Sequence, residues 1–425
     1  MRIAAPLALL GGALACGTPD VDAPLRFWAF GREGEVVAQL VRDFEREHPG
    51  SRVRVQQFPW TAAHEKLLTA YVGDAAPDVA QLGNTWIPEF VALRAIVPLD
   101  SLLAGSRQVT PAGYFPGIWA TNVLDGRLYG VPWYVDTRVV FYRQDLLAQA
   151  GYASVPSTWT EWRRAMEHVR LRAGARYGIY LPTNEWAQPV ILGMQAGSPL
   201  LRDGARHGAF ADTAFRRAFD FYVGLYRDTL APVFGTNDVA NLYQEFARGT
   251  FAMYISGPWN LGEFRRRLPA AMQNAWATAP LPGPDSEHPG ISLAGGASLV
   301  VFRRSRRAAD AWRLIEFLSR PEQQVRFFQL SGNLPARIEA WGDPLLAGDT
   351  RAQAFRRQLD RVQAPPAIPE WEQITSKLID RAEIAIRGGA PVAVVLAALD
   401  QDVEVILEKR RWLLQREDAA PRRRQ

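Results

Sequence analysis

Cysteine is nearly absent from this chain of 425 residues, in which Cys16 is the only one. A single thiol cannot form a disulfide within the chain, and it excludes a structural zinc site built from several thiolates. Long apolar segments are also missing beyond the N-terminal residues. Because no later segment holds roughly 18 consecutive apolar residues, we expect nothing after the N-terminal segment to cross a membrane.

Motifs of several enzyme classes are absent as well. The chain has no Gly-x-Ser-x-Gly turn for a hydrolase nucleophile. It also lacks a glycine-rich phosphate loop ending in Lys-Ser or Lys-Thr, and a Gly-x-Gly-x-x-Gly dinucleotide motif. We therefore expect no catalytic residue, no metal and no cofactor. The histidines are scattered without metal-ligand spacing, at His48, His64, His168, His207 and His288.

Lysine is scarce, so arginine carries nearly all of the positive charge; the lysines are Lys66, Lys377 and Lys409. The formal net charge is +5, and Arg422, Arg423 and Arg424 at the C-terminus supply three of these charges. No zinc-finger or RNP-like motif accompanies the basic clusters. We therefore expect no nucleic-acid partner.

The first residues have the pattern of an export signal. Arg2 is followed by an apolar run of about a dozen residues, too short to span a bilayer core that needs ~20. The end of this run, Ala15-Cys16-Gly17, resembles the lipobox of bacterial lipoproteins, which implies lipid attachment at Cys16. The alternative is an ordinary signal peptide with an incidental cysteine. We expect a signal over residues 1–16 and a short, polar, proline-bounded tether over 17–24.

Strand and helix patterns alternate from Leu25 onward. Apolar and alternating segments predict strands at 25–30, 52–56 and 77–82, with amphipathic helices between and after them. This alternation favours a parallel α/β sheet with crossover helices, and the length allows two domains. Further strands are expected at 139–142, 177–180 and 299–302, and helices at 159–169, 213–226, 308–318 and 371–414, the last broken at 388–391.

Tryptophan is abundant, with 14 residues, and many of them fall at predicted strand ends or turns. Open α/β sheets bind ligands at the carboxyl ends of their strands. A flat ring there can stack on the apolar face of a sugar while nearby polar groups bind its hydroxyls. Any single tryptophan could belong to the core, but we expect at least three of this set to face a ligand: Trp60, Trp86, Trp133, Trp186, Trp259 and Trp371.

Two stretches resemble a known family. Residues 131–143, which begin Val-Pro-Trp-Tyr-Val-Asp, and residues 253–260, Met-Tyr-Ile-Ser-Gly-Pro-Trp-Asn, resemble the extracellular solute-binding proteins (family 1) of carbohydrate ABC importers, in particular the maltose/trehalose-binding group. Supporting pieces are Pro156-Ser-Thr-Trp159, Gly295-Gly296 and Gly332-Asn-Leu-Pro-Ala-Arg337. The resemblance runs in order from about Leu25 to Leu407.

The resemblance implies a two-lobed periplasmic-binding-protein fold of type II. Each lobe is then an α/β sheet with flanking helices, the lobes are joined by a multi-strand hinge, and the ligand lies between them. Lobe one is expected at 25–133 plus 293–331, and lobe two at 137–290 plus 335–414. Residues 415–425 form a basic tail.

Site residues follow from the resemblance position by position. Glu33 resembles an acidic hydroxyl ligand, and Asn84 and Thr85 lie where relatives often place an aspartate. Trp259 is expected to be a stacking platform, and Arg337 resembles an arginine that binds hydroxyls. The remaining expected contacts are Tyr134 and Asp136 at the first hinge crossing, Gly296 for close backbone approach, Trp371 as a second platform and, on weaker grounds, Arg32, Trp86, Glu185 and Trp186.

Other roles remain open for three of these residues. Trp259 could cap the core after a strand that Pro258 stops. Asp136 could be a hinge hydrogen-bonding residue that never meets ligand. Arg337 could form a salt bridge between the lobes.

The resemblance predicts a monomeric, lipid-anchored receptor in the periplasm or at the cell surface. It would deliver a di- or oligosaccharide to ABC permease subunits and break no bond. One alternative is an anionic ligand, such as a glycerophosphodiester or an acidic sugar, bound by Arg32 and Arg337. A second is a glycoside hydrolase with two of Glu33, Asp136 and Glu185 roughly 5–10 Å apart, and a third is a sensor partner without transport.

Overall fold

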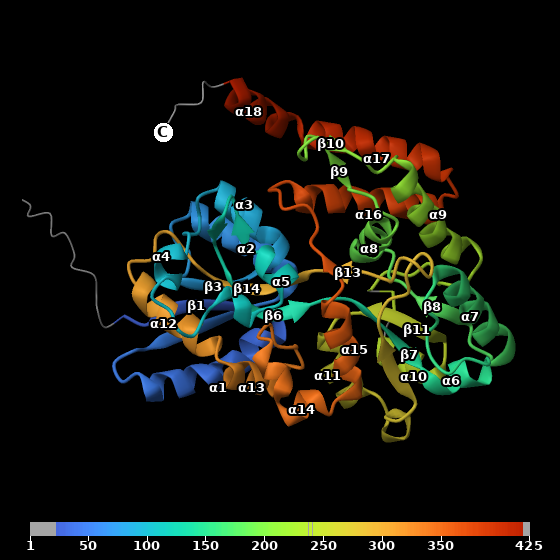
Figure 1. The fold of residues 1–425 in the computed structure, drawn as a ribbon, viewed down its shortest axis with the longest axis horizontal. Helices are drawn as coiled ribbons and strands as arrows, with labels where there is room; N and C mark the ends of the chain where they lie inside the picture. The colour runs from blue at the N-terminus through green and yellow to red at the C-terminus, as the bar shows by residue number, and fades with distance from the viewer. Residues whose placement is uncertain (1–22, 237, 240, 420–425) are drawn as a thin grey trace, which may run out of the picture.

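Two β-sheets with helices on both faces form the two lobes of the protein (Figure 1). The computed structural model describes residues 23–236, 238–239 and 241–419. The expected signal, Cys16, most of the tether and the last six residues of the basic tail lie outside the described residues. Among the described residues, no helix is long and apolar enough to cross a membrane.

The first sheet has the strand order β2-β1-β3-β14-β6. Strands β1 (Leu25–Phe30), β2 (Val53–Phe58) and β3 (Val79–Gly83) are parallel, which confirms the expected crossover arrangement. Strand β14 (Gly295–Val301) is antiparallel to both β3 and β6 (Val131–Asp136). The expected parallel arrangement does not extend to this edge, because β14 enters from the other lobe instead of following a crossover helix.

Helices cover both faces of the first sheet. On one face lie α1 (Gly31–Glu47), α12 (Ala308–Leu318) and α13 (Pro321–Ser331), and the buried side of α1 is formed by the apolar residues that recur at helical spacing in the sequence. On the other face lie α2 (Trp60–Val72) and α3 (Ile87–Ala92).

The second sheet has the strand order β12-β7-β11-β8. Strand β11 (Phe251–Ser256) is antiparallel to β7 (Val139–Arg143) and parallel to β8 (Tyr177–Tyr180). Strand β12 (Trp276–Ala279) pairs with β7 at the edge. Strands β7 and β11 are buried along their whole length, as expected of strands covered on both faces.

Two groups of helices enclose the second sheet. The helices of the first group pack in one hydrophobic cluster. They are α7 (Trp159–Arg172), α8 (Ala187–Gln195), α9 (Thr213–Arg227), α16 (Trp371–Arg387) and α17 (Val392–Ile406). The gap between α16 and α17 is at the predicted break. The other group is α10 (Leu242–Arg248), α11 (Trp259–Arg267) and α15 (Thr350–Leu359).

The remaining elements are short connections and the last helix. They are α4 (Asp100–Leu103), α5 (Pro116–Ala120), β4 (Val123–Leu124), β5 (Arg127–Leu128), α6 (Gln144–Gln149), β9 (Leu201–Arg202), β10 (His207–Gly208), β13 (Ser292–Leu293), α14 (Pro344–Ala347), β15 (Val362–Gln363) and α18 (Glu408–Ala419), with single 3-10 turns at Asn84–Trp86, Pro111–Gly113, Ala270–Met272 and Glu339–Gly342.

The chain passes between the lobes through extended segments. Strand β6 continues past residue 133 as far as Asp136, and β7 of the second sheet begins at Val139. On the return, β13 pairs with β15 and leads directly into β14. The Val135 N–H donates to the Leu334 carbonyl at 3.0 Å, so the segment after α13 lies beside β6.

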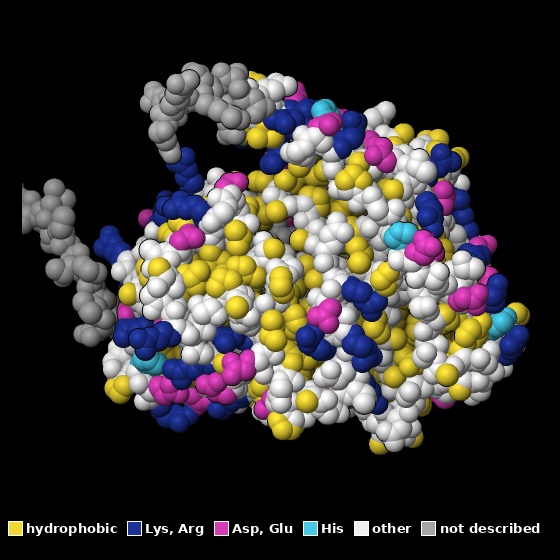
Figure 2. Space-filling model, in the orientation of Figure 1, with side chains coloured by type: hydrophobic (Ala, Val, Ile, Leu, Met, Phe, Trp, Pro, Cys, Tyr) yellow, Lys and Arg dark blue, Asp and Glu magenta, His cyan; other side chains and the backbone are white. Residues whose placement is uncertain are grey.

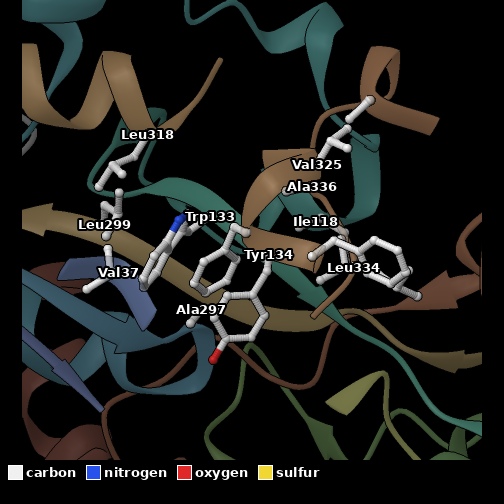
Figure 3. Packing of buried hydrophobic residues seen from close by; sticks show 14 of the residues in the cluster. Val37, Ile118, Trp133, Tyr134, Ala297, Leu299, Leu318, Val325, Leu334 and Ala336 are labelled. Atoms are coloured by element: carbon white, nitrogen blue, oxygen red, sulfur yellow. The ribbon is translucent and has the colours of Figure 1, made fainter. Parts of the chain in front are cut away.

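The end of β6 is fixed by a buried aromatic cluster (Figure 3). The Trp133 ring stacks on Phe327 with a centroid distance of 4.3 Å, and Tyr134 lies 6.0 Å from the same ring. The Tyr134 hydroxyl points away from the labelled apolar side chains in Figure 3. Strand β6 therefore anchors one tryptophan in the core and presents one tyrosine hydroxyl at its edge.

Candidate ligand-binding site

A cavity of about 550 Å³ lies between the lobes. This is within the usual size range of small-molecule sites. The first sheet and its helices contribute Arg32, Glu33, Trp60, Gly83, Asn84, Thr85, Trp86, Tyr134, Asp136, Gly295, Gly296, Ser331 and Asn333. The hinge segment and the second lobe contribute Arg138, Trp186, Trp259, Glu263, Leu293 and Glu372.

Glu33 lies in the first turn of α1, directly after the end of β1. The turn requires Gly31, whose φ is +52° and whose missing Cβ would lie 2.6 Å from Cδ1 of Trp60. Glu33 is buried and accepts hydrogen bonds from Asn333 Nδ2 at 2.7 Å and from Trp60 Nε1 at 3.2 Å. Burial raises the pKa of the Glu33 carboxyl. A carboxyl held this way can accept a hydrogen bond from a ligand hydroxyl.

Tyr134 shares this corner of the cavity. Its hydroxyl accepts a hydrogen bond from Gln81 Nε2 at 2.9 Å, and Gln81 Oε1 accepts from the Phe30 N–H at 2.9 Å. Burial raises the pKa of Tyr134, and the nearby carboxylates of Glu33 and Asp136 raise it further. The phenol therefore remains protonated, with its oxygen at a fixed position.

Asp136, Arg138 and Glu185 form a charge cluster at the first hinge crossing, in which the Arg138 side chain is buried and the two carboxylates are partly exposed. Nη1 of Arg138 lies 2.5 Å from Oδ1 of Asp136, and Nη2 lies 3.9 Å from Oε2 of Glu185. Burial raises the pKa of Asp136, while the Arg138 guanidinium acts in the opposite direction. The guanidinium also lies 4.5 Å from the centre of the Trp259 ring.

Trp259 begins α11, and only Gly257 and Pro258 separate it from the end of β11 at Ser256. Gly257 makes room for it, because a Cβ there would lie 1.9 Å from Cζ3 of the Trp259 ring. The helix start is tied to the strand by a hydrogen bond from Asn260 Nδ2 to Ser256 Oγ at 2.6 Å. The indole is thereby held at the carboxyl end of a strand, where the Gly-Pro-Trp motif predicts it.

The two lobes approach each other at Thr85 and Glu372. Glu372, in the first turn of α16, lies where this helix contacts the turn Asn84–Trp86, and burial raises the pKa of its carboxyl. Its Oε1 is buried and has no hydrogen-bond partner among the described residues. Beside Thr85, the Asn84 side chain makes two hydrogen bonds within the first lobe. Its Nδ2 donates to Thr121 Oγ1 at 2.7 Å, and its Oδ1 accepts from Ser298 Oγ at 2.8 Å.

Three expected ligand contacts do not line the cavity. Arg337 instead donates to the carbonyls of Gln108 at 2.6 Å and Ser319 at 3.2 Å, because its backbone bridges to Tyr114 in the first lobe. Trp371 is 1% exposed and packs in the core of the second lobe. Glu185 lies 3.9 Å from Arg138 and is not among the residues that line the cavity. All other expected contacts line the cavity: Arg32, Glu33, Asn84, Thr85, Trp86, Tyr134, Asp136, Trp186, Trp259 and Gly296.

Several lining residues were not expected from the sequence. Arg138 and Asn333 lie inside the motifs that carry the resemblance, so their position there was an available signal. Glu372 directly follows Trp371, which was the expected contact. In the structure Trp371 is buried against Trp186 at a centroid distance of 5.9 Å, and it is Glu372 that faces the cavity. Glu263 offered no sequence signal, because it lies mid-helix in a charged stretch.

The cavity has the chemistry of a polar-ligand site. Aromatic rings from both lobes face it, with Trp60 and Trp86 at a centroid distance of 5.5 Å on one side. In the part of the chain that the structure describes, no group of three or more His, Cys, Asp or Glu side chains could hold a metal ion. Two α/β lobes around such a cavity define a bilobal ligand receptor.

Comparison with known proteins assigns the receptor to a family. The sequence profile described as "Bacterial extracellular solute-binding protein" matches residues 31–325, more than half of the chain. The chain therefore belongs to the bacterial extracellular solute-binding proteins. This family membership agrees with the resemblance found in the sequence, and the two-lobed α/β fold class is confirmed.

Individual relatives are similar along nearly the whole chain. The sugar-binding protein MalE from Xanthomonas citri, whose structure has been solved, is 47% identical, with a TM-score of 0.87 over 92% of this chain and 99% of that chain. The diacetylchitobiose binding protein DasA of Streptomyces coelicolor is 24% identical over 85% of this chain and 86% of its own length. The GacH receptor of Streptomyces glaucescens, at 23% identity and a TM-score of 0.80 over 91% of this chain and 98% of that chain, shows the shared fold.

Proposed function

We propose that this protein is the sugar receptor of a carbohydrate ABC importer. It captures a di- or oligosaccharide between its lobes and delivers it to membrane permease subunits. The observation that carries the proposal is that tryptophans from both lobes, Trp60, Trp86, Trp186 and Trp259, line one cavity with carboxylates between them. Indole rings bind the apolar faces of sugar rings, and carboxylates accept their hydroxyls.

The relatives support a sugar ligand. A protein 47% identical to this chain is a sugar-binding protein, and a galactooligosaccharide-binding protein of Bacillus subtilis is 24% identical over 89% of this chain and 87% of its own length. Glu33, Tyr134 and Asp136 are the proposed hydroxyl ligands from the first lobe and the hinge. Trp259 is the proposed stacking platform, and Gly296 allows close approach of the backbone. Arg337 and Trp371 are left out of this set.

Hinge closure supplies the mechanism. A sugar held by Glu33 and Tyr134 in the first lobe gains contacts with Trp259 and Glu372 when the second lobe closes over it. Binding then favours the closed form by the difference between its affinities for the two forms. The permease recognises that closed form. Because this cycle breaks no bond, the proposed receptor needs no cofactor.

An anionic ligand is disfavoured by the charges that line the cavity. Glu33, Asp136, Glu263 and Glu372 face Arg32 and Arg138 there, and Asp136 already pairs with Arg138. Arg337, which an anionic ligand would need, donates to backbone carbonyls elsewhere. The excess of carboxylates suits a neutral sugar.

Bond cleavage has little support. Glu185, one of the candidate acids of a glycoside hydrolase, does not line the cavity, and the relatives are binding proteins. We therefore propose that the protein is not an enzyme. Sustained release of reducing sugar by the purified protein would contradict this.

The receptor is proposed to act in the periplasm or at the cell surface as a monomer held by a lipid on Cys16. Membership of an extracellular family supports the location, and one relative is an uncharacterized lipoprotein of Streptomyces antibioticus, 26% identical. Replacing Cys16 by Ser is expected to shift the protein from the membrane fraction to the soluble fraction while leaving sugar affinity unchanged. Loss of affinity together with the anchor would contradict the tether.

Calorimetric titration tests the proposed ligand class. The purified protein is titrated with maltose, trehalose, sucrose and a set of glycerophosphodiesters. Saturable 1:1 binding of at least one neutral sugar is expected. Binding of the phosphodiesters alone would overturn the proposal in favour of an anionic ligand.

A further inference from the structure

The segment that follows α13 runs beside β6 and borders the cavity. Ser331 and Asn333 of this segment both line the cavity, and Asn333 is 2% exposed. The side-chain amide of Asn333 donates a hydrogen bond from Nδ2 to Oε1 of Glu33 at 2.7 Å. The two residues are 300 positions apart in the sequence. This bond therefore joins the start of α1 to the segment between the lobes.

Glu33 is held by neutral hydrogen-bond donors. Acidic and basic side chains lie close together over much of the face shown in Figure 2. Glu33 differs from such surface carboxylates, because no Lys, Arg or His in the described part of the chain forms an ion pair with it. Asn333 donates to Oε1, and the Trp60 indole N–H donates to Oε2 at 3.2 Å. Each carboxylate oxygen can accept about two hydrogen bonds, so acceptor capacity remains for a ligand hydroxyl.

The bond from Asn333 also favours the form of Glu33 that accepts. Burial raises the pKa of Glu33, and the hydrogen bond from Asn333 acts in the opposite direction. An ionised carboxylate only accepts hydrogen bonds, whereas a protonated one also donates. The amide therefore favours a carboxylate that receives hydroxyl protons from a ligand.

The backbone around Asn333 is fixed on both sides. Gly332 ends α13 with a φ of +87°, and a Cβ on it would lie 3.1 Å from the backbone N of Gly262 in α11. On the other side, Leu334 is buried in the hydrophobic cluster of Figure 3. The Asn333 amide therefore reaches Glu33 from a backbone that packs against a helix of the second lobe.

We propose that Asn333 is a positioning residue for Glu33 and fixes its carboxyl in the orientation that accepts a sugar hydroxyl. This role rests on the proposed function, since it lies within the proposed sugar site. Without the amide, the carboxyl loses one of the two donors that fix its plane, and ordering it again on binding costs conformational entropy. Through Gly332, the same amide links a ligand contact of the first lobe to α11, which carries Trp259.

A double-mutant cycle measured by calorimetry tests the proposal, with the sugar that the unaltered protein binds. Asn333→Leu keeps the branched shape of the side chain but removes the donor, and it should raise the Kd about ten-fold. Glu33→Ala removes the carboxyl itself and should raise the Kd at least as much. Because Asn333 acts through Glu33, the double variant should bind within about two-fold of Glu33→Ala alone.

Gln353→Leu is the matched control. Gln353 Nε2 donates one hydrogen bond to the Leu346 carbonyl at 2.9 Å, and neither residue lines the cavity. The control should therefore leave the Kd unchanged. Circular dichroism shows whether Asn333→Leu is folded. If it is not, Asn333→Ala, which adds no bulk, takes its place in the cycle.

Two results would overturn this proposal while the sugar-receptor function stands. One is an unchanged Kd for the folded Asn333 variant. The other is a double variant in which the two single losses multiply, because Asn333 would then contact the sugar itself or only support the fold. If the unaltered protein binds no sugar at all, the proposed function fails and this role of Asn333 fails with it.

Discussion

The guanidinium of Arg138 lies over the indole of Trp259, 4.5 Å from its ring centre. The same guanidinium pairs with Asp136 across the hinge crossing. A cation against one face of the ring leaves the opposite face for a sugar. The charge cluster at the hinge therefore holds the expected stacking platform, Trp259, in position. Through Arg138, a ligand-contacting ring is connected to the segment that bends when the lobes close.

Trp259→Ala should weaken sugar binding by ~1–3 kcal/mol, because the stacking and the buried ring surface are lost. Calorimetric titration with the sugar that binds the unaltered protein measures the change. Trp412→Ala, which removes an exposed tryptophan outside the cavity, is the matched control and should leave the Kd unchanged. An unchanged Kd for Trp259→Ala would remove this residue from the site.

Arg138→Met should destabilise the fold even without ligand. It leaves Asp136 and Glu185 close together without their shared cation. Because both carboxylates are partly exposed, we expect a loss of about 1–3 kcal/mol in the free energy of unfolding. Urea denaturation followed by tryptophan fluorescence measures it.

Arg164→Met provides the comparison for this variant. Arg164 and Glu161 form an ion pair with side chains about half exposed, so its loss should change stability by under about 0.5 kcal/mol. Equal effects of the two substitutions would mean that the hinge cluster has no special role.

Glu33→Gln should change how stability depends on pH. Burial raises the pKa of Glu33 above the ordinary value of 4.5, so the folded protein holds this proton more tightly than the unfolded chain. In the unliganded protein, this group's contribution to stability is therefore present below pH 4.5 and is lost as pH rises through the folded pKa. The variant lacks this loss, so its stability relative to the unaltered protein should increase over that window.

Urea denaturation at a series of pH values measures this difference. Glu35→Gln is the control, because Glu35 lies on the same helix in a half-exposed ion pair with Arg32. Its profile should follow that of the unaltered protein. A Glu33→Gln profile parallel to the unaltered one at every pH would contradict the role assigned to burial.

Gly296→Ala should disturb the hinge. The φ of Gly296 is +153°, and a Cβ there would lie 2.2 Å from the carbonyl oxygen of Tyr134. We expect a loss of about 1–3 kcal/mol in stability and weaker sugar binding, since β6 must move. Gly342→Ala, where a Cβ meets nothing within 4 Å, should leave both unchanged. Thermal unfolding and calorimetry give the two readouts.

Glu33 and Trp259 were expected in the site from the family resemblance, and both line the cavity, each within three residues of the end of a strand, β1 or β11. The same reasoning could not place Glu372. Which of two neighbours on α16, Trp371 or Glu372, faces the cavity depends on how that helix packs against the second lobe. Arg337 was expected to contact ligand but does not line the cavity, for a similar reason. A backbone bridge between Arg337 and Tyr114 directs its side chain into the first lobe.

The fold was more predictable than the site. Alternating strand and helix patterns predicted β1, β2 and β3, because each of these strands is paired through a local crossover. The antiparallel addition of β14 and β6 could not be read from periodicity. It depends on the chain leaving one lobe and returning from the other, which is a long-range property of the topology.

A crystal structure of the protein grown with the neutral sugar that calorimetry identifies tests the central claim most directly. The account predicts one sugar between the lobes, with a ring stacked on Trp259 and hydroxyls bonded to Glu33 or Asp136. Sugar bound away from this cavity, or in it without contact to Trp259 and either carboxylate, would contradict the account.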